Sequence, residues 1–145
     1  MVKVNLVCVG KLKESYWREA AQEYAKRLGR FCRLEIRELP ERASLKEEAA
    51  DILRAAKGYI IALAVEGKRC SSEAFADKIQ SLVDAGTEIT FIIGSSCGLD
   101  GEVKAQAREM ISFSEMTFPH QMMRVVFLEQ LYRAFMIGAG AEYHK

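Results

Sequence analysis

Tyr59-Ile-Ile-Ala-Leu-Ala-Val65 is a continuous apolar run, and Glu88-Ile-Thr-Phe-Ile-Ile93 is a second one. Between them, residues 72–85 have the length and apolar spacing of an amphipathic helix, which Gly86 ends. Continuous apolar strands joined by a helix are typical of a parallel sheet covered on both faces. The stretch therefore predicts a buried strand–helix–strand unit at the centre of an α/β fold.

The rest of the chain continues this alternation. Apolar or alternating runs predict strands over residues 2–9, 33–39 and 110–114. Amphipathic segments predict helices over residues 14–28, 45–56 and 100–109, and a last helix that follows Pro119 and includes Phe135. No linker, repeat or low-complexity tract interrupts the pattern. We expect one α/β domain over residues 1–145, with a mostly parallel sheet flanked by helices.

Length and composition are those of a globular protein. The 145 residues are 50% hydrophobic and 28% charged, which suffices for one domain with its own core. No apolar run is long enough to span a bilayer, and the chain begins with a strand-like segment rather than a signal peptide. These features predict a cytoplasmic protein with no membrane partner.

Positive charge is concentrated near the N-terminus. The net charge is only +1, but residues 1–46 hold eleven Lys and Arg against six Glu, a local net charge of +5. Such a segment can face the phosphates of a nucleic acid. It can equally be a solvated helix face of mixed charge, and the sequence supports both interpretations.

The sequence has no signature of a metal site. Its four cysteines lack C-x-x-C spacing and it has only two histidines, so we expect reduced thiols and no bound metal. Cys97 lies in a glycine-rich loop and is either a reactive thiol or simply a small loop residue. Neither a Ser-His-Asp order nor an H-E-x-x-H helix occurs.

Three loops follow predicted parallel strands, at residues 66–69, 94–98 and 115–120. Because ligands of open α/β sheets bind at the carboxyl ends of the strands, these loops can line one pocket. The glycines of the second loop match neither a dinucleotide fingerprint nor a Walker A loop. Pro119 stiffens the third loop, so that its backbone can bind a flat heterocycle such as adenine, or it simply begins the helix.

The last helix is apolar on nearly every side, which predicts that both the core and a second subunit cover it. His120, at its start, is interpreted as a capping or packing residue. Arg124 and Arg133 belong either to an interface network or to a contact with RNA phosphate. The interface network is the favoured interpretation.

The C-terminal tail combines an aromatic ring, an imidazole and a cation. Tyr143 can stack on a base, while His144 and Lys145 can meet a phosphate or accept a proton. The alternative is a frayed terminus without a function. The residues alone leave both interpretations open.

Five segments resemble the RlmH family (formerly the YbeA family) of bacterial ribosomal RNA methyltransferases in the SPOUT superfamily. They are Val7-Cys-Val-Gly-Lys11, Phe91-Ile-Ile-Gly-Ser-Ser-Cys-Gly-Leu99, Ser112-Phe-Ser-Glu-Met-Thr-Phe-Pro-His-Gln-Met-Met-Arg-Val-Val126, Glu129-Gln-Leu-Tyr-Arg-Ala-Phe135 and Tyr143-His-Lys145. The resemblance covers the whole chain. It implies a SPOUT-type fold with a C-terminal deep trefoil knot, a homodimer, and S-adenosylmethionine as cofactor.

The resemblance also implies a reaction and a site. The substrate would be N3 of a pseudouridine in the subunit-bridging stem-loop of 23S rRNA, within the assembled 70S ribosome. Carried over by position, the cofactor contacts are Leu63, Gly94, Phe113, Ser114, Glu115, Met116, Thr117 and Phe118. One departure is Ser95, where the family usually has a second glycine and where a side chain could narrow the pocket.

For catalysis we hypothesise that His144 helps to remove the N3 proton, with Tyr143 and Arg133 ordering the nucleotide. A second subunit is expected to contribute the tail or the basic N-terminal third. Two other functions fit the residues: a non-catalytic ribosome-binding factor, and a dimeric sensor that binds adenosyl compounds without turnover.

Overall fold

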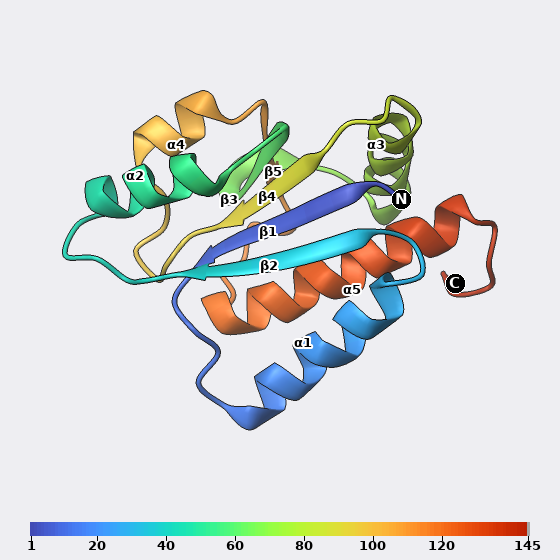
Figure 1. Ribbon diagram of the computed structural model, residues 1–145, viewed down its shortest axis with the longest axis horizontal. Coiled ribbons are helices and arrows are strands. Elements are labelled where there is room, and N and C mark those ends of the chain that lie inside the picture. The colour runs from blue at the N-terminus through green and yellow to red at the C-terminus, as the bar shows by residue number, and fades with distance from the viewer. Residues whose placement is uncertain (145) are drawn as a thin grey trace.

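The structure is a computed structural model that describes residues 1–144, so Lys145 of the tail lies outside the described residues. Its elements in chain order are β1 (Lys3–Val9), α1 (Ser15–Leu28), β2 (Arg33–Leu39), α2 (Leu45–Ala55), β3 (Tyr59–Arg69), α3 (Ser72–Asp84), β4 (Ile89–Ile93), α4 (Gly101–Gln106), β5 (Glu109–Ser112) and α5 (His120–Gly138). The strands form one parallel sheet in the order β2-β1-β4-β3-β5, with helices on both faces (Figure 1). This architecture confirms the predicted α/β fold class.

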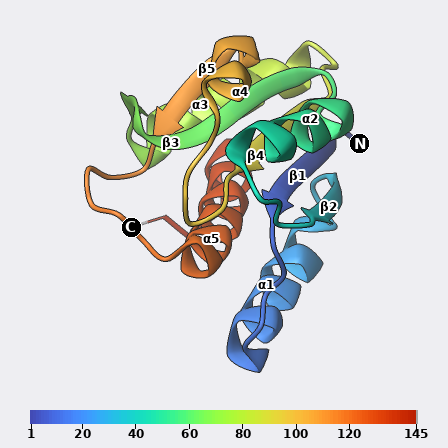
Figure 2. The ribbon, with the colours of Figure 1, turned by 90° about the vertical axis from the view of Figure 1, so that its left-hand side faces the viewer.

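Two layers of helices enclose the sheet. Helices α1, α3 and α5 cover one face, while α2 and α4 cover the other (Figure 2). On the first face the ring of Phe91 in β4 lies 4.6 Å from that of Phe127 in α5, centroid to centroid. On the second face Ile92 of β4 packs among Ile52 of α2 and Val103 of α4. Because both faces are buried, β1, β3 and β4 need the continuous apolar runs found in the sequence.

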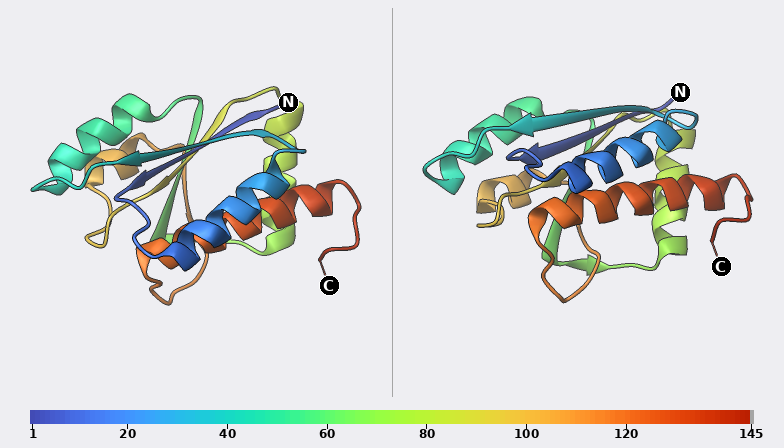
Figure 3. Two further views of the ribbon diagram at one scale, coloured as in Figure 1. Left: turned by 60° about the horizontal axis from the view of Figure 1, so that its bottom comes forward. Right: turned by 90° about the horizontal axis from the view of Figure 1, so that it is seen from below.

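Helix α1 runs beside α5 under the sheet (Figure 3). Aromatic side chains fill the contact towards the end of α5, where the rings of Phe31 and Phe135 are stacked with their centroids 5.5 Å apart. Tyr24 of α1 meets Tyr132 of α5 at a ring distance of 6.4 Å. The core therefore covers α5 from the sheet and from α1, which accounts for much of its apolar surface.

Strand β3 is longer than the sequence predicted. Residues 66–69, expected to be a loop, continue β3, and Lys68 and Arg69 pair with Ile111 and Ser112 of β5 after a shift in register. Gly67 permits this pairing, since a Cβ there would lie 2.7 Å from the carbonyl carbon of Met110. The prediction of a loop at residues 66–69 was therefore wrong. Helix α4 is shorter than expected and ends at Gln106.

At the far end of α5 the chain reverses direction. Gly140 has a φ of 70°, and its N–H donates to the Ile137 carbonyl while the N–H of Ala141 donates to that of Met136. A left-handed glycine with these two bonds is a common helix stop. The turn sends residues 141–144 back along α5.

The trefoil knot implied by the resemblance stays a prediction. Within the described residues no helix is long and apolar enough to cross a membrane.

Candidate functional site

Two adjoining cavities lie at the carboxyl ends of β4 and β5, beside the register shift of β3. They share six lining residues: Leu63, Ala64, Val65, Thr117, Phe118 and Met123. The smaller cavity, of about 90 Å³, is completed by residues 111–114 and Met116. The larger, of about 520 Å³, extends over residues 93–96, Gly98 and Leu99 and reaches Glu66, Lys104, Pro119 and His120. The loops that follow β4 and β5 thus meet residues 63–66 of β3 at one site.

The glycine loop (residues 94–98) is tightly folded beside the larger cavity. A Cβ on Gly94 would lie 2.4 Å from the carbonyl oxygen of Gly98, and Gly98 itself has a φ of 87°. The N–H of Gly98 donates to the Ser95 carbonyl at 2.9 Å. These constraints hold the loop backbone against the cavity, where a ligand can approach it closely.

The 113–119 loop forms the opposite wall. The Ser112 hydroxyl donates to the Ser114 carbonyl at 2.9 Å, and the Ser114 hydroxyl accepts from the N–H of Met116 at 3.0 Å. Such short-range bonds from serine fix a turn without regular secondary structure. The loop then enters α5 at Pro119, which precedes the first helical residue and whose side chain makes no cap.

Two side chains of opposite charge lie side by side in the lining of the larger cavity. Glu66 comes from β3 and Lys104 from α4, and they form an ion pair. The hydrogen bond from Lys104 holds the pKa of the Glu66 carboxyl below its ordinary value. A ligand with one positive and one negative group matches this pair of charges.

A second group of polar residues lies at the other end of α5. This C-terminal cluster consists of Glu73, Glu129, Arg133, Tyr143 and His144. Glu129 accepts from Arg133 at 2.8 Å and from the Tyr143 hydroxyl at 2.9 Å. Arg133 also lies over the Tyr143 ring, 4.9 Å from its centroid. His144 is 3.0 Å from Arg133 through Nδ1 and 2.6 Å from Glu73 through Nε2. The tail is therefore docked rather than frayed.

The contacts of the cluster define its protonation. Arg133 can only donate, so Nδ1 of His144 accepts, and the imidazole proton sits on Nε2 and is donated to Glu73. Burial, together with the hydrogen bond to Glu129, raises the pKa of Tyr143 to about 12. Tyr143 is thus a hydrogen-bond donor at neutral pH. The same carboxylate raises the pKa of Arg133.

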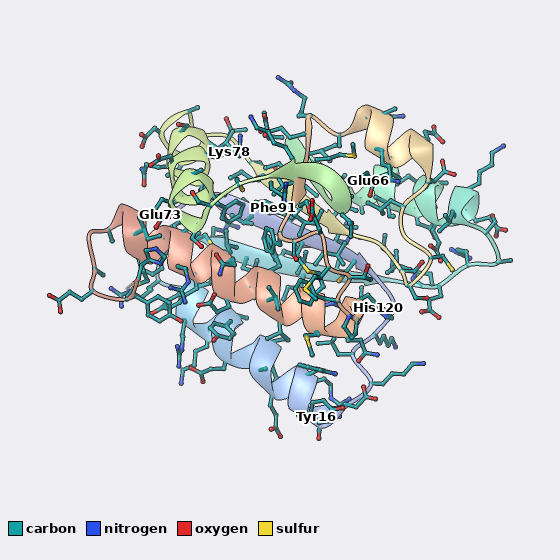
Figure 4. The ribbon with its side chains drawn as sticks, turned by 180° about the vertical axis from the view of Figure 1, so that it is seen from behind. Tyr16, Glu66, Glu73, Lys78, Phe91 and His120 are labelled. Atoms are coloured by element: carbon teal, nitrogen blue, oxygen red, sulfur yellow. The ribbon has the colours of Figure 1, made fainter. Side chains whose placement is uncertain are left out.

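The cavities and the C-terminal cluster are far apart within one chain. His120 and Glu73 mark opposite ends of α5 (Figure 4). Arg133 follows Met123, the last cavity residue on α5, by ten positions. At 1.5 Å per residue these positions are about 15 Å apart along the helix. The cluster of one chain therefore lies well away from the cavities of the same chain.

Comparison with known proteins is consistent across the whole chain. A protein-family model described as "Predicted SPOUT methyltransferase" matches residues 2–144. The chain is 45% identical to the ribosomal RNA large subunit methyltransferase H of Streptococcus suis and 46% identical to that of Streptococcus uberis. Each alignment covers 99% of this chain and 100% of the relative. The chain belongs to the RlmH family of SPOUT methyltransferases.

A solved structure supports the fold assignment of this RlmH family member. A probable methylase family protein from Haemophilus influenzae superposes with a TM-score of 0.55 over 96% of this chain and 67% of that one. The sequences are only 11% identical, so the likeness concerns the fold alone.

In this RlmH family member most of the expected cofactor residues line the cavities: Leu63, Gly94, Phe113, Ser114, Met116, Thr117 and Phe118. Glu115 does not; it is exposed and pairs with Arg69 at 3.2 Å. Sequence reasoning placed the segment of Glu66 at the pocket, although as a loop and not as a strand, and it gave no signal for Lys104. His120 is half-buried at the start of α5 and lines the larger cavity, and the capping or packing role expected for it stays a prediction.

Arg124 belongs to a buried network. It is 1% exposed, donates to Glu38 at 2.6 Å and to the Gly10 carbonyl at 3.0 Å, and leaves its Nε without a partner. These contacts lie within one chain, so the interface network expected for Arg124 stays a prediction. Cys97 is an exposed thiol of the glycine loop. Among the described residues no group of three potential ligands could hold a metal ion.

Proposed function

We propose that this chain methylates the RNA of the large ribosomal subunit, with S-adenosylmethionine as methyl donor. The observation that carries the proposal is the pair of adjoining cavities, built from residues 63–66 of β3 and from the loops that follow β4 and β5. The relatives at 45% and 46% identity are named ribosomal RNA large subunit methyltransferases, which supports this substrate class.

The residues present fit the cofactor. Gly94 lines the larger cavity with backbone alone, because the tight turn onto Gly98 leaves no room for a Cβ. The smaller cavity, with Phe113 and Phe118 in its walls, suits the adenine ring, and the backbone of the 113–119 loop offers it polar groups. Lys104 and Glu66 suit the carboxylate and the ammonium of the methionine part. When bound, S-adenosylmethionine supplies a methyl group activated by its sulfonium.

The finer target in this proposal is N3 of a pseudouridine in the subunit-bridging stem-loop of 23S rRNA. The substrate is the assembled 70S ribosome, and the reaction takes place in the cytoplasm. Support comes from the resemblance of residues 112–126 to the RlmH family. The basic segment over residues 1–46 offers RNA phosphates a surface, since of its eleven cations only Lys3, Arg27 and Arg42 form ion pairs within the described residues.

The separation of tail and cavities supports a homodimer with shared sites. In a two-fold symmetric dimer whose axis is perpendicular to α5, this helix and its copy run antiparallel. The end of one α5 then lies beside the start of the other, which brings the C-terminal cluster of one subunit to the cavities of its partner. The face of α5 that points away from the core carries Met122, Val126 and Arg133 at helical spacing, all of them half-buried within one chain.

In this dimer the nucleotide is positioned by Arg133 and Tyr143, and its N3 proton is removed by His144. Arg133 binds a phosphate and the Tyr143 hydroxyl donates a hydrogen bond. His144 takes the N3 proton through Nδ1, which requires that Arg133 first release Nδ1 and turn to the phosphate. Glu73 holds Nε2–H and so keeps the imidazole oriented during this exchange.

The test is methyl transfer from labelled S-adenosylmethionine to 70S ribosomes from a strain that lacks the modification, with the labelled nucleotide mapped by mass spectrometry. We expect label on N3 of one pseudouridine of the large subunit. Ribosome binding without label, and without affinity for the cofactor, would instead identify a non-catalytic ribosome-binding factor. Cofactor binding without label on any RNA would identify a sensor of adenosyl compounds.

A further inference from the structure

A buried acidic side chain on α2 reaches the glycine loop from the face of the sheet opposite α5. Glu48 is 5% exposed, and among the described residues it makes no ion pair. Its Oε2 accepts from the backbone N–H of Arg42 at 3.1 Å, and its Oε1 accepts from the Ser95 hydroxyl at 3.1 Å. A buried carboxyl group costs stability unless such donors satisfy it.

Ser95 carries this contact into the loop. Its hydroxyl oxygen also accepts from the N–H of Cys97 at 3.3 Å, and its carbonyl accepts from the N–H of Gly98. Ser95 thus links the buried carboxylate of Glu48 to the backbone of Cys97 and Gly98 in the glycine loop. Ser95 itself lines the larger cavity. We call the Ser95–Glu48 hydrogen bond the tether. Without it, no side-chain hydrogen bond within the described residues would join the loop to the rest of the fold. The loop's glycines would then allow it many backbone conformations.

We infer that Glu48 is a positioning residue for the cofactor: through Ser95 it holds the glycine loop in the conformation that binds S-adenosylmethionine. This inference rests on the proposed function. The inference also explains Ser95. Where the family usually has a glycine, this chain has a serine, and the serine hydroxyl donates the hydrogen bond to Glu48. Glu48 does not line either cavity and acts only through the loop.

The test uses the full chain with Glu48→Ala, Ser95→Ala and the double variant. Dissociation constants for S-adenosylhomocysteine are measured by calorimetry. We expect each single variant to bind about fivefold to tenfold more weakly, the effect of one hydrogen bond to an acidic group. The double variant should be no weaker than either single variant, because both remove the same tether. At saturating cofactor the turnover number of Glu48→Ala should stay near that of the wild type, because Glu48 lines neither cavity.

Two further variants separate positioning from stability. Glu48→Gln keeps an acceptor for Arg42 and a polar partner for Ser95, so it should bind the cofactor within about twofold of the wild type. Asp51→Asn is the matched control: Asp51 is also buried on α2, but it pairs with Arg42 and Arg54, away from the loop. It should lower the melting temperature and leave cofactor affinity unchanged.

Hydrogen exchange provides a readout without any cofactor. In the free protein, the amides of residues 95–98 should exchange faster in Ser95→Ala than in the wild type, while those of Asp51→Asn should not. Unchanged loop exchange and unchanged affinity in Ser95→Ala would overturn the inference, and so would additive losses in the double variant. A wild type that binds no cofactor, with loop exchange changed as expected, would instead refute the proposed function and leave the tether intact.

Discussion

At the scale of single residues, the C-terminal cluster depends on Glu129. This carboxylate accepts from both Arg133 and Tyr143, and the aromatic ring lies under the guanidinium. The arrangement makes Tyr143 a donor and ties up the free nitrogen of His144. The tail is therefore poised in a resting state, which a nucleotide must rearrange before proton transfer.

The shifted pKa of Tyr143 predicts how the tail responds to alkali. Its folded-state pKa of about 12 lies above the ordinary value of 10.0, so the protonated phenol stabilises the docked tail below pH 10.0. That stabilisation is lost as the pH rises from 10.0 through about 12. The difference in phenolate absorbance between wild type and Tyr143→Phe should therefore rise near pH 12. A rise near pH 10 would mean that Tyr143 is not bonded to Glu129.

The Lys104–Glu66 ion pair in the lining of the larger cavity predicts that removal of Lys104 weakens cofactor binding. Lys104→Met should raise the dissociation constant of S-adenosylmethionine roughly threefold to tenfold, because a cation near the carboxylate is lost. Lys78→Met is a matched control, since Lys78 has the same side-chain exposure of 32% and pairs with Glu109 at 2.7 Å without lining either cavity. Calorimetry should find equal affinities for the control and the wild type. Equal affinities for the wild type, Lys104→Met and Lys78→Met would show that Lys104 does not bind the cofactor.

These residue contacts mark the limit of what the sequence predicted. The tail residues were singled out, but the partners that dock them were not. Glu73 is 71 positions from His144, and no periodicity relates the two. The cofactor residues came from a resemblance and from the rule that ligands bind at the carboxyl ends of parallel strands. Glu66, Lys104 and the buried Glu48 could be placed only once the helices were packed.

At the scale of elements, the long buried strands were read correctly because both faces of the sheet are covered. The exception is the end of β3. Glu66-Gly-Lys-Arg69 has the composition of a turn, yet it pairs with β5 at the edge of the sheet. A short irregular edge strand has no apolar pattern of its own, and its pairing is fixed by the approach of the β5 backbone to Gly67.

This pairing predicts the effect of a methyl group at Gly67. Gly67→Ala should lower the free energy of unfolding by about 1–3 kcal/mol, because the added Cβ meets the β5 backbone. Gly101→Ala is the control, since a Cβ there meets nothing within 4 Å and the position is helical. The control should leave the stability unchanged or raise it by about 0.5 kcal/mol. Urea denaturation measures both, and an unaffected Gly67→Ala would contradict the strand pairing.

At the scale of the whole molecule, the described chain has its cavities at one end of α5 and its docked tail at the other. The fold uses α5 as a spacer between two half-sites (Figure 4). Only a second copy, reversed along α5, brings the two halves together in the function proposed here. The two-fold dimer is therefore part of the proposed mechanism.

The outward face of α5 should accordingly control assembly. Val126→Arg places a charge in the middle of the proposed interface, and we expect a monomer that still binds the cofactor but transfers no methyl group. Leu53→Arg alters a half-buried residue of α2, in the opposite layer, and should remain a dimer. Analytical ultracentrifugation distinguishes the two outcomes. An active monomer of Val126→Arg would exclude shared sites.

The most direct test of the account mixes two inactive proteins. Gly94→Ala disrupts the glycine loop that lines the larger cavity, since its Cβ would lie 2.4 Å from the Gly98 oxygen, and Arg133→Ala removes the cation of the tail. Each variant alone should be inactive. After the subunits exchange at equal amounts, the mixture should recover about a quarter of the wild-type rate, because half of the dimers then hold one intact site of two. A mixture as inactive as its components would show that cavity and tail act within one subunit, and would contradict the shared site.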